Sequence, residues 1–283
     1  MGRAAVTRAP ARHVLEVEGL VASAGGREVL HGVSLEVRSG EVHVLMGPNG
    51  SGKSTFAHAL MGRPGVTVTA GSIRLDGVEL SGMPSWKRAR AGLFLALQQP
   101  IEVPGVLLDA MLLDAMLEEA VLEEAALEEA APEEAVLEEA ATARTDVQAR
   151  LRHEAAAIGF DERFLLRPLN VDLSGGERKR NEVVQLGVLR PAIAVLDEID
   201  SGLDVDAVRA VARRLEAATS EWGLGVLAVT HFHRLLRELP ADFVHVLVDG
   251  RIAASGGPDL AEQLERTGYT AYGVAGEDPA GGS

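Results

Sequence analysis

The sequence predicts an α/β fold with a parallel-sheet core, an antiparallel β subdomain and a helical subdomain. Three observations predict it. Short apolar runs at 93–97, 193–196 and 224–230 end at polar residues, as buried parallel strands do. The run at 41–46 leads through a glycine-rich loop into a segment with helix-compatible spacing. Residues 14–37 alternate apolar and polar side chains around a glycine turn, which predicts short antiparallel strands.

Composition excludes several classes of protein. The 283 residues, 47% of them apolar, can bury a sizeable core. No apolar run approaches the ~20 residues that span a bilayer. The chain has no cysteine, which excludes disulfides, thiolate catalysis and cysteine-ligated metal centres on this chain. We therefore expect a soluble, cytoplasmic protein without direct membrane insertion.

The net charge of −15 comes mainly from one segment. Residues 101–140 hold Glu102, Asp109, Asp114 and ten further glutamates without any Lys or Arg, so this segment contributes −13 and the remaining chain −2. An acidic segment argues against a nucleic-acid groove in that region. We expect no nucleic-acid partner.

The glycine-rich loop reads GPNGSGKST and contains the full G-x-x-x-x-G-K-[ST] phosphate-loop pattern. Its glycines let successive backbone N–H groups surround a phosphate, and the following helix adds the positive end of its dipole. We expect Lys53 to bridge the β- and γ-phosphates of ATP, Ser54 to ligate Mg²⁺ and Thr55 to bond the α-phosphate. A purely structural turn would leave Lys53 without a role. The expected nucleotide-binding residues of this loop are Gly47, Pro48, Asn49, Gly50, Ser51, Gly52, Lys53, Ser54 and Thr55.

Two acids follow the apolar run at 193–196. A buried parallel-type strand places them at the carboxyl edge of the sheet, where ligands bind in such folds. We expect Asp197 to hold Mg²⁺ and Glu198 to orient or deprotonate the attacking water. An apolar run followed by two acids is by itself a common strand end, so the assignment depends on the preceding phosphate loop.

Two further strand ends carry candidate catalytic residues. Gln98 follows one apolar run, and its amide could reach Mg²⁺ or the attacking water. His231 follows another run and could contact the γ-phosphate. A lone Gln is usually a surface residue and a lone strand-end His a capping residue, so both assignments depend on position.

The phosphate loop, Gln98, LSGGE at 173–177, LDE at 196–198, SGLD at 201–204 and His231 occur in the order of the ABC-type ATPases. The chain resembles that superfamily over roughly residues 14–270. Within it, the chain looks like the SufC family, the ATPase subunits of the Suf iron–sulfur cluster assembly system. The phrases that carry this resemblance are QQPIEVPGV from Gln98, SGGERKRNEVVQ from Ser174 and LDEIDSGLDVDA from Leu196. Transport ATPases more often have glutamine and proline where this chain has Glu177 and Ile199.

The resemblance implies an ABC-type ATPase that works with two related scaffold proteins, SufB and SufD. It also implies that ATP is held between two ATPase subunits, with the signature of one facing the γ-phosphate bound by Lys53 of the other. A signature turn at a helix N-terminus can stabilise phosphate charge only where it meets phosphate, which requires a second chain. The residues expected to serve that second site are Ser174, Gly175, Gly176 and Asp204.

Two features depart from the family pattern. No aromatic residue precedes Phe56, although many ABC ATPases stack adenine on one upstream of the phosphate loop. The stretch 117–140 repeats LEEA-like pentads, and because a five-residue step turns about 500° the leucines form no single stripe. We interpret this stretch as an exposed, mobile acidic insertion in which Pro132 breaks or kinks the helix. The alternative is an arm that docks on a basic partner surface.

These observations predict a division of the chain into parts. The expected parts are a disordered tail at 1–12, an ATP-binding core with its β subdomain at 13–98 and 190–270, a helical subdomain at 99–189 containing the insertion at 108–142, and a flexible tail at 271–283.

A hypothesis about regulation concerns Lys179. In the nucleotide-free subunit it would pair with the carboxylate of Glu198 or Asp200 and hold the catalytic acid away from water. The alternative is a solvated lysine on a helix. Three other functions were weighed for the whole chain: the energy-coupling subunit of a membrane transporter, a non-enzymatic ATP-gated interaction protein, and a nucleic-acid-associated ABC protein.

Overall fold

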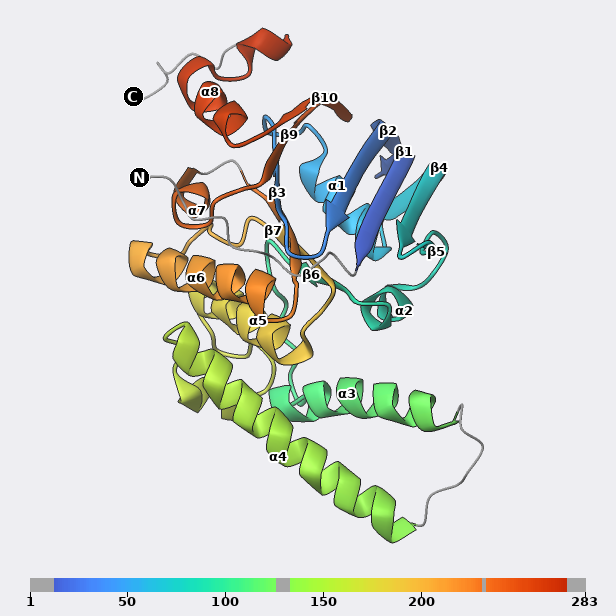
Figure 1. The fold of residues 1–283 in the computed structure, drawn as a ribbon, viewed down its shortest axis with the longest axis vertical. Coiled ribbons are helices and arrows are strands. Elements are labelled where there is room, and N and C mark those ends of the chain that lie inside the picture. Colours follow the sequence, from blue (N-terminus) through green and yellow to red (C-terminus); the bar gives the residue numbers. More distant parts are fainter. Residues whose placement is uncertain (1–12, 126–132, 231–232, 274–283) are drawn as a thin grey trace.

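The computed structural model describes residues 13–125, 133–230 and 233–273, and the side chains at 117–141 and at 233 lie outside that description. The described chain forms two sheets with helices packed around them (Figure 1). The tail expected to be disordered at 1–12, and most of the one expected to be flexible at 271–283, lie outside the described residues. Pro132 also lies outside them.

The N-terminal part forms a four-stranded antiparallel sheet, as the alternation at 14–37 predicts. The tight turn between its first two strands falls at Gly25 and Gly26, where both φ angles are positive, a conformation that glycine adopts without steric cost. The strand order is β2-β1-β4-β5. The strands are β1 (Val14–Ala24), β2 (Arg27–Arg38), β4 (Val66–Leu75) and β5 (Val78–Glu79).

The central sheet has six strands in the order β10-β9-β3-β8-β7-β6. Neighbours from β9 to β6 run parallel, and β10 is antiparallel to β9. The predicted parallel-sheet core is therefore confirmed. Its carboxyl edge carries the phosphate loop after β3, and Asp197 and Glu198 at the end of β7. The strands are β3 (Val42–Met46), β6 (Leu93–Ala96), β7 (Ile193–Asp197), β8 (Gly225–Val229), β9 (Phe243–Val248) and β10 (Arg251–Gly256).

Alternate side chains of a strand point to opposite faces of the sheet. Every residue of β7 is buried, so both faces of the central sheet are covered there. Ile193 and Val195 belong to one apolar cluster, which includes the antiparallel sheet and the first helix. Ala194 and Leu196 belong to the other, which includes the helices of the opposite layer. The helices are α1 (Lys53–Met61), α2 (Ser85–Arg90), α3 (Leu108–Ala125), α4 (Glu133–Ala157), α5 (Gly175–Leu189), α6 (Val205–Glu221), α7 (His233–Glu238) and α8 (Asp259–Thr267), with 3₁₀ turns at Glu162–Leu166 and Thr270–Tyr272.

The backbone of the acidic stretch is helical on both sides of the undescribed residues. Helices α3 and α4 project together from the body of the molecule (Figure 1). The expected exposure of the LEEA-like repeats concerns side chains outside the described ones. Among the described residues, no helix combines the length and apolarity needed to cross a membrane.

A buried ion pair joins α4 to α6 across α5. The Arg214 guanidinium donates to both carboxylate oxygens of Glu154, with the Nη2–Oε1 bond at 2.8 Å. The carboxylate passes over Gly187 of α5, where an added Cβ would lie 2.2 Å from it. A larger residue at this position would therefore force the Glu154 carboxylate to move.

We expect Gly187→Ala to destabilise the protein by about 3 kcal/mol, because the methyl group displaces the buried Glu154 carboxylate and leaves Arg214 with the exposed Glu221 as its remaining ion-pair partner. Urea unfolding measures this change. Gly257→Ala is the matched control, since a Cβ at Gly257 has no atom within 4 Å, and it should unfold like the wild type. Equal stability of both variants would show that Glu154 relocates without cost.

Candidate functional site

The phosphate loop connects β3 to α1 and closes around its own lysine. Lys53 Nζ donates to the backbone oxygens of Gly47 at 2.8 Å and Pro48 at 2.9 Å. Gly47 leaves no room for a side chain, because an added Cβ would lie 2.1 Å from the carbonyl oxygen of Leu247. Gly52 precedes the helix at φ 105°, a conformation that favours glycine. The loop is thus shaped as the sequence predicts, with a buried ammonium group inside it.

The other loop residues differ in exposure. Asn49 and Gly50 are exposed at the tip, and Thr55 is half-buried on the first turn of α1. Within the described part of the chain, the buried Ser51 hydroxyl has no hydrogen-bond partner. A buried hydroxyl without a partner in a glycine-rich loop is consistent with a polar ligand at this position.

The predicted metal ligands Ser54 and Asp197 lie together. Ser54 Oγ donates to Asp197 Oδ1 at 3.3 Å, and Asp197 is fully buried at the end of β7. Among the described residues, Asp197 Oδ2 has no hydrogen-bond partner. Burial raises the pKa of the Asp197 carboxyl, and the neighbouring Glu198 raises it further. A buried, unpartnered carboxylate oxygen beside a hydroxyl fits Mg²⁺, which prefers oxygen ligands.

Lys53 lies in the electrostatic field of the same acids. Burial lowers the pKa of its ammonium group, while Glu198 and Asp197 act in the opposite direction. The end of β7 and the phosphate loop after β3 therefore lie together at one edge of the sheet, as expected for a nucleotide site.

Gln98 and Glu198, both predicted to be catalytic, are in direct contact. Gln98 Nε2 donates to Glu198 Oε2 at 2.6 Å. Glu198 is buried and has φ 50°, a left-handed backbone conformation that is strained for a residue with a side chain. Its backbone N–H donates to Val229 of β8 at 2.8 Å, which holds that conformation in place. In this arrangement the carboxylate is engaged by the Gln98 amide.

The structure corrects the expected partner of Lys179. Its ammonium group donates to the backbone carbonyl oxygen of Glu198 and not to a carboxylate. The alternative of a solvated lysine is also wrong, because Lys179 is only 5% exposed. Burial lowers the pKa of Lys179, and the negative charges of Asp200 and Glu198 oppose that shift. Asp200 accepts a hydrogen bond from Thr230 Oγ1 at 3.2 Å.

The signature forms the N-terminus of α5. Ser174 is the N-cap, and with Glu177 it forms a reciprocal capping box. These hydrogen bonds lower the pKa of Glu177. Gly175 is exposed, and Gly176 packs against the loop that follows Glu198, since an added Cβ would lie 3.3 Å from the Gly202 oxygen. An added Cβ at Gly175 would meet no atom within 4 Å, so the start of α5 is open at this residue.

The loop that ends at Asp204 lies beside the signature. Asp204 is the N-cap of α6, where its carboxylate accepts from the N–H of Ala207 at 2.7 Å. One groove is lined by the signature, this loop and the segment 98–100. The predicted residues of the second site therefore share one surface.

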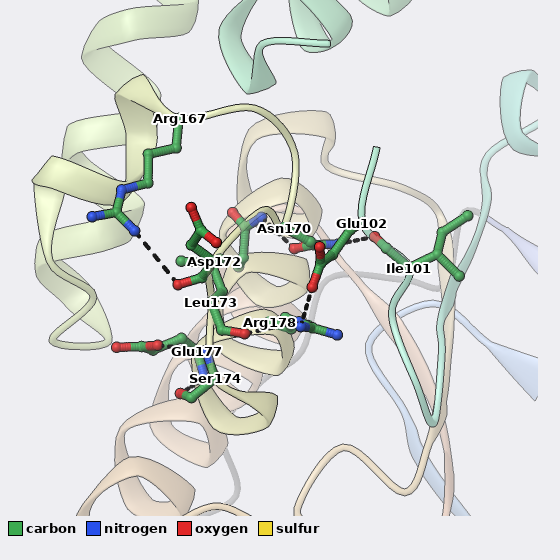
Figure 2. A network of polar contacts seen from close by, with 10 residues as sticks. Ile101, Glu102, Arg167, Asn170, Asp172, Leu173, Ser174, Glu177 and Arg178 are labelled. Carbon is green, nitrogen blue, oxygen red and sulfur yellow. Dashed lines mark hydrogen bonds and ion pairs between the residues drawn. The ribbon is translucent and has the colours of Figure 1, made fainter. Parts of the chain in front are cut away.

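A polar network ties the segment after Gln98 to the signature (Figure 2). Asn170 Nδ2 donates to the Ile101 oxygen at 2.9 Å, and Arg178 Nε donates to the Leu173 oxygen at 2.9 Å. Arg178 also forms an ion pair with Glu102. The two segments are held together by several bonds, so we expect them to move together.

Two further residues, His231 and Tyr269, concern the nucleotide site. His231 lies outside the described residues, so its contact with the γ-phosphate stays a prediction. Tyr269 was not predicted, yet its hydroxyl accepts a hydrogen bond from the backbone N–H of Gly47. No local pattern signals that contact, because it joins the C-terminal part of the chain to the phosphate loop.

Comparison with known proteins places these motifs in a family. A family model described as ABC transporter matches residues 30–201. A probable ABC transporter ATP-binding protein of Streptococcus pyogenes is 41% identical over 73% of this chain and 74% of its own length. Vegetative protein 296 of Bacillus subtilis is 41% identical over 73% of this chain and 72% of its own length. A probable ATP-dependent transporter of Synechocystis is 40% identical over 73% of this chain and 75% of its own length.

Solved structures share the fold. An ATP-binding subunit of an ABC transporter has a TM-score of 0.66 at 24% identity, covering 90% of this chain and 95% of its own. A bacterial ABC transporter cassette solved as a dimer has a TM-score of 0.66 at 20% identity, covering 86% of this chain and 98% of its own.

Proposed function

The chain belongs to the ABC transporter family of ATP-binding proteins and is an ABC-type ATPase, and we propose that it drives a cytosolic iron–sulfur cluster assembly scaffold. The observation that carries this choice is Glu177, which forms the capping box at the signature where transport ATPases more often have glutamine. Ile199, fully buried where transport ATPases more often have proline, supports the same choice. Two related scaffold proteins, similar to SufB and SufD, are the expected partners.

The geometry supports a division of labour in hydrolysis. Lys53 and the backbone N–H groups of the phosphate loop bind the phosphates of ATP. Ser54 and Asp197, with Gln98, would hold Mg²⁺, which neutralises phosphate charge when bound. Glu198 accepts the proton of the water that attacks the γ-phosphorus, so that ADP and phosphate leave.

The contact between Gln98 and Glu198 orients the proposed catalytic carboxylate. Gln98 engages one oxygen of the Glu198 carboxylate at 2.6 Å, and a carboxylate has a second oxygen that can accept the proton of water. Lys179 holds the carbonyl of the same residue through a buried hydrogen bond. We infer that the contact with Gln98 sets the orientation of the Glu198 carboxylate toward the attacking water, and that docking of the scaffold near Gln98 adjusts it.

We further propose that ATP is bound between two copies of this chain. The signature lies in a groove with Ser201–Asp204, and it forms the N-terminus of α5, which is open at Gly175. Such a turn stabilises phosphate charge once a phosphate reaches it. A second copy would supply that phosphate on its own Lys53. Hydrolysis would then open the pair, and ATP would act as a clamp on the scaffold.

The alternative is the energy-coupling subunit of a membrane transporter. It is favoured by two relatives, which are named a probable ABC transporter ATP-binding protein and a probable ATP-dependent transporter. The two functions predict different partners, because a transporter subunit needs a permease that touches the Gln98 region.

A pull-down of the tagged chain from its native host distinguishes these functions. It is done in parallel with ADP and with a non-hydrolysable ATP analogue, and the captured proteins are identified by mass spectrometry. We expect two related scaffold proteins under both conditions. Recovery of a polytopic permease in their place contradicts the proposed function and leaves only the ATP chemistry.

A further inference from the structure

Glu182 is a buried acid whose role the proposed mechanism does not use. It lies on α5, two turns after the signature, and is 7% exposed. Its Oε2 accepts from the backbone N–H of Leu97 at 2.7 Å. Burying an acid without an ion-pair partner costs free energy. A buried carboxyl that accepts a hydrogen bond from one backbone N–H therefore calls for an explanation.

The Leu97 N–H, which donates to Glu182, lies where the chain leaves the central sheet. The pairing of β6 with β7 ends at Ala96 opposite Leu196, so Leu97 is the first residue beyond the ladder. The Glu182 carboxyl takes the place of a strand partner for that N–H. It thereby sets the position at which the backbone turns away toward Gln98.

The next residue carries the contact that matters for hydrolysis. Gln98 donates to the Glu198 carboxylate at 2.6 Å. A hydrogen bond to the backbone of Leu97 fixes the residue directly before that amide. The held N–H belongs to the peptide unit before Leu97, so only the two backbone dihedrals of Leu97 separate it from the peptide unit of Gln98.

Glu198, the hydrogen-bond partner of Gln98, is also bound by a residue of α5. Lys179 lies three residues before Glu182, which places both on one face of α5. Lys179 donates to the backbone oxygen of Glu198, and Glu182 accepts from Leu97. One helix face therefore anchors the backbone on both sides of the amide–carboxylate contact.

We propose that Glu182 is a positioning residue for ATP hydrolysis: through Leu97 it sets where the Gln98 amide meets the Glu198 carboxylate. The proposal depends on the proposed role of Glu198 as the base. Because α5 begins at Ser174, movement of the signature on engaging nucleotide would move both anchors together. Glu182 thus links the signature to the water-activating acid of its own chain.

The electrostatic surroundings of Glu182 favour its uncharged form, which is consistent with a structural role in which its oxygen accepts a hydrogen bond. Burial raises its pKa to about 8, whereas the Leu97 N–H, Lys179 and Arg63 act to lower it. At pH 7 the carboxyl is therefore mainly protonated, and glutamine is its closest mimic. An amide oxygen accepts the same hydrogen bond from Leu97.

Three variants of the full chain test the proposal: Glu182→Leu, Glu182→Gln and the stability control Val183→Ala. For each, kcat and KM for ATP are measured in the presence of Mg²⁺. Glu182→Leu keeps the volume and removes the acceptor, and it should lower kcat by roughly tenfold to a hundredfold through misplacement of catalytic groups. Its KM should stay within about twofold, since ATP binding does not use this contact. Glu182→Gln should restore kcat to within about threefold of the wild type because it retains the acceptor.

Val183→Ala controls for loss of stability. Val183 is buried on the same helix, so its truncation should lower the melting temperature without changing kcat where the protein is folded. Glu182→Met replaces Glu182→Leu if the latter does not fold. A wild-type kcat in Glu182→Leu, or a kcat in Glu182→Gln as low as in Glu182→Leu, overturns the proposal.

Glu198→Gln is assayed alongside the three variants. Wild-type turnover in Glu198→Gln contradicts the proposed function and the positioning role with it. A loss in Glu198→Gln with no loss in Glu182→Leu contradicts the positioning role alone.

Discussion

Replacing Glu198 with glutamine is expected to lower ATP turnover by on the order of 10² to 10⁴ while ATP binding is retained. The substitution removes the group that accepts a proton from water and preserves the shape of the side chain. Binding is retained because Lys53 and the phosphate loop, which hold the phosphates, are unchanged. Steady-state hydrolysis and equilibrium binding of a fluorescent ATP analogue measure the two effects separately.

The matched control for this substitution is Glu262→Gln. Glu262 is exposed on α8, and the same chemical change there should leave turnover unaltered. Retained turnover in Glu198→Gln would move the role of activating water elsewhere, with Gln98 and His231 as the remaining candidates. A loss of binding in Glu198→Gln would show that this residue helps to hold the nucleotide.

Replacing Lys53 with alanine is expected to weaken ATP binding roughly 10- to 100-fold, the cost of losing a charge-assisted hydrogen bond to phosphate. In the structure the ammonium group donates to the Gly47 and Pro48 oxygens, so it is already directed into the loop where the phosphates bind. Turnover should fall as well, since the same charge stabilises the transferred phosphoryl group. Titration with the fluorescent ATP analogue measures the affinity.

Lys87→Ala is the control for the loss of a lysine. Lys87 lies on α2 against the ring of Trp86, outside the phosphate loop, and its removal should leave ATP affinity unchanged. An unchanged affinity in Lys53→Ala would contradict the assignment of the phosphate loop.

The sequence predicted the parts of the site that local pattern determines. A strand, a glycine loop and a helix are close in the chain, so the placement of Lys53 after β3 follows from GPNGSGKST alone. The burial of Asp197 at a strand end follows from the apolar run before it. Parallel strands then bring both ends to one edge of the sheet.

Contacts that depend on helix packing could not be predicted in the same way. Gln98 and Glu198 are separated by 100 residues, and their direct hydrogen bond depends on how β6 leaves the sheet. Lys179 was expected to reach a carboxylate because charge alone suggests it, but the left-handed backbone of Glu198 lies over α5 and supplies its carbonyl oxygen in that place. No sequence pattern distinguishes Glu182, since an acid among helix formers is usually solvated.

The acidic stretch shows a second limit. The pentad spacing of its leucines excludes a single apolar stripe, yet Ala, Leu and Glu favour helix, and the backbone is helical in α3 and α4. Helix propensity determined the local structure there, while the absence of a stripe left the packing partner of the repeats undefined.

Mixing two inactive variants tests most directly whether the site is shared between two copies. Lys53→Ala removes the phosphate lysine, and Ser174→Arg blocks the signature, so each variant alone should be inactive. In a mixed dimer, one site combines both defects and the other combines the intact Lys53 of one chain with the intact Ser174 of the other. We predict that mixing restores part of the wild-type ATPase activity. Activity that stays at the sum of the separate variants at every mixing ratio would contradict the two-chain site.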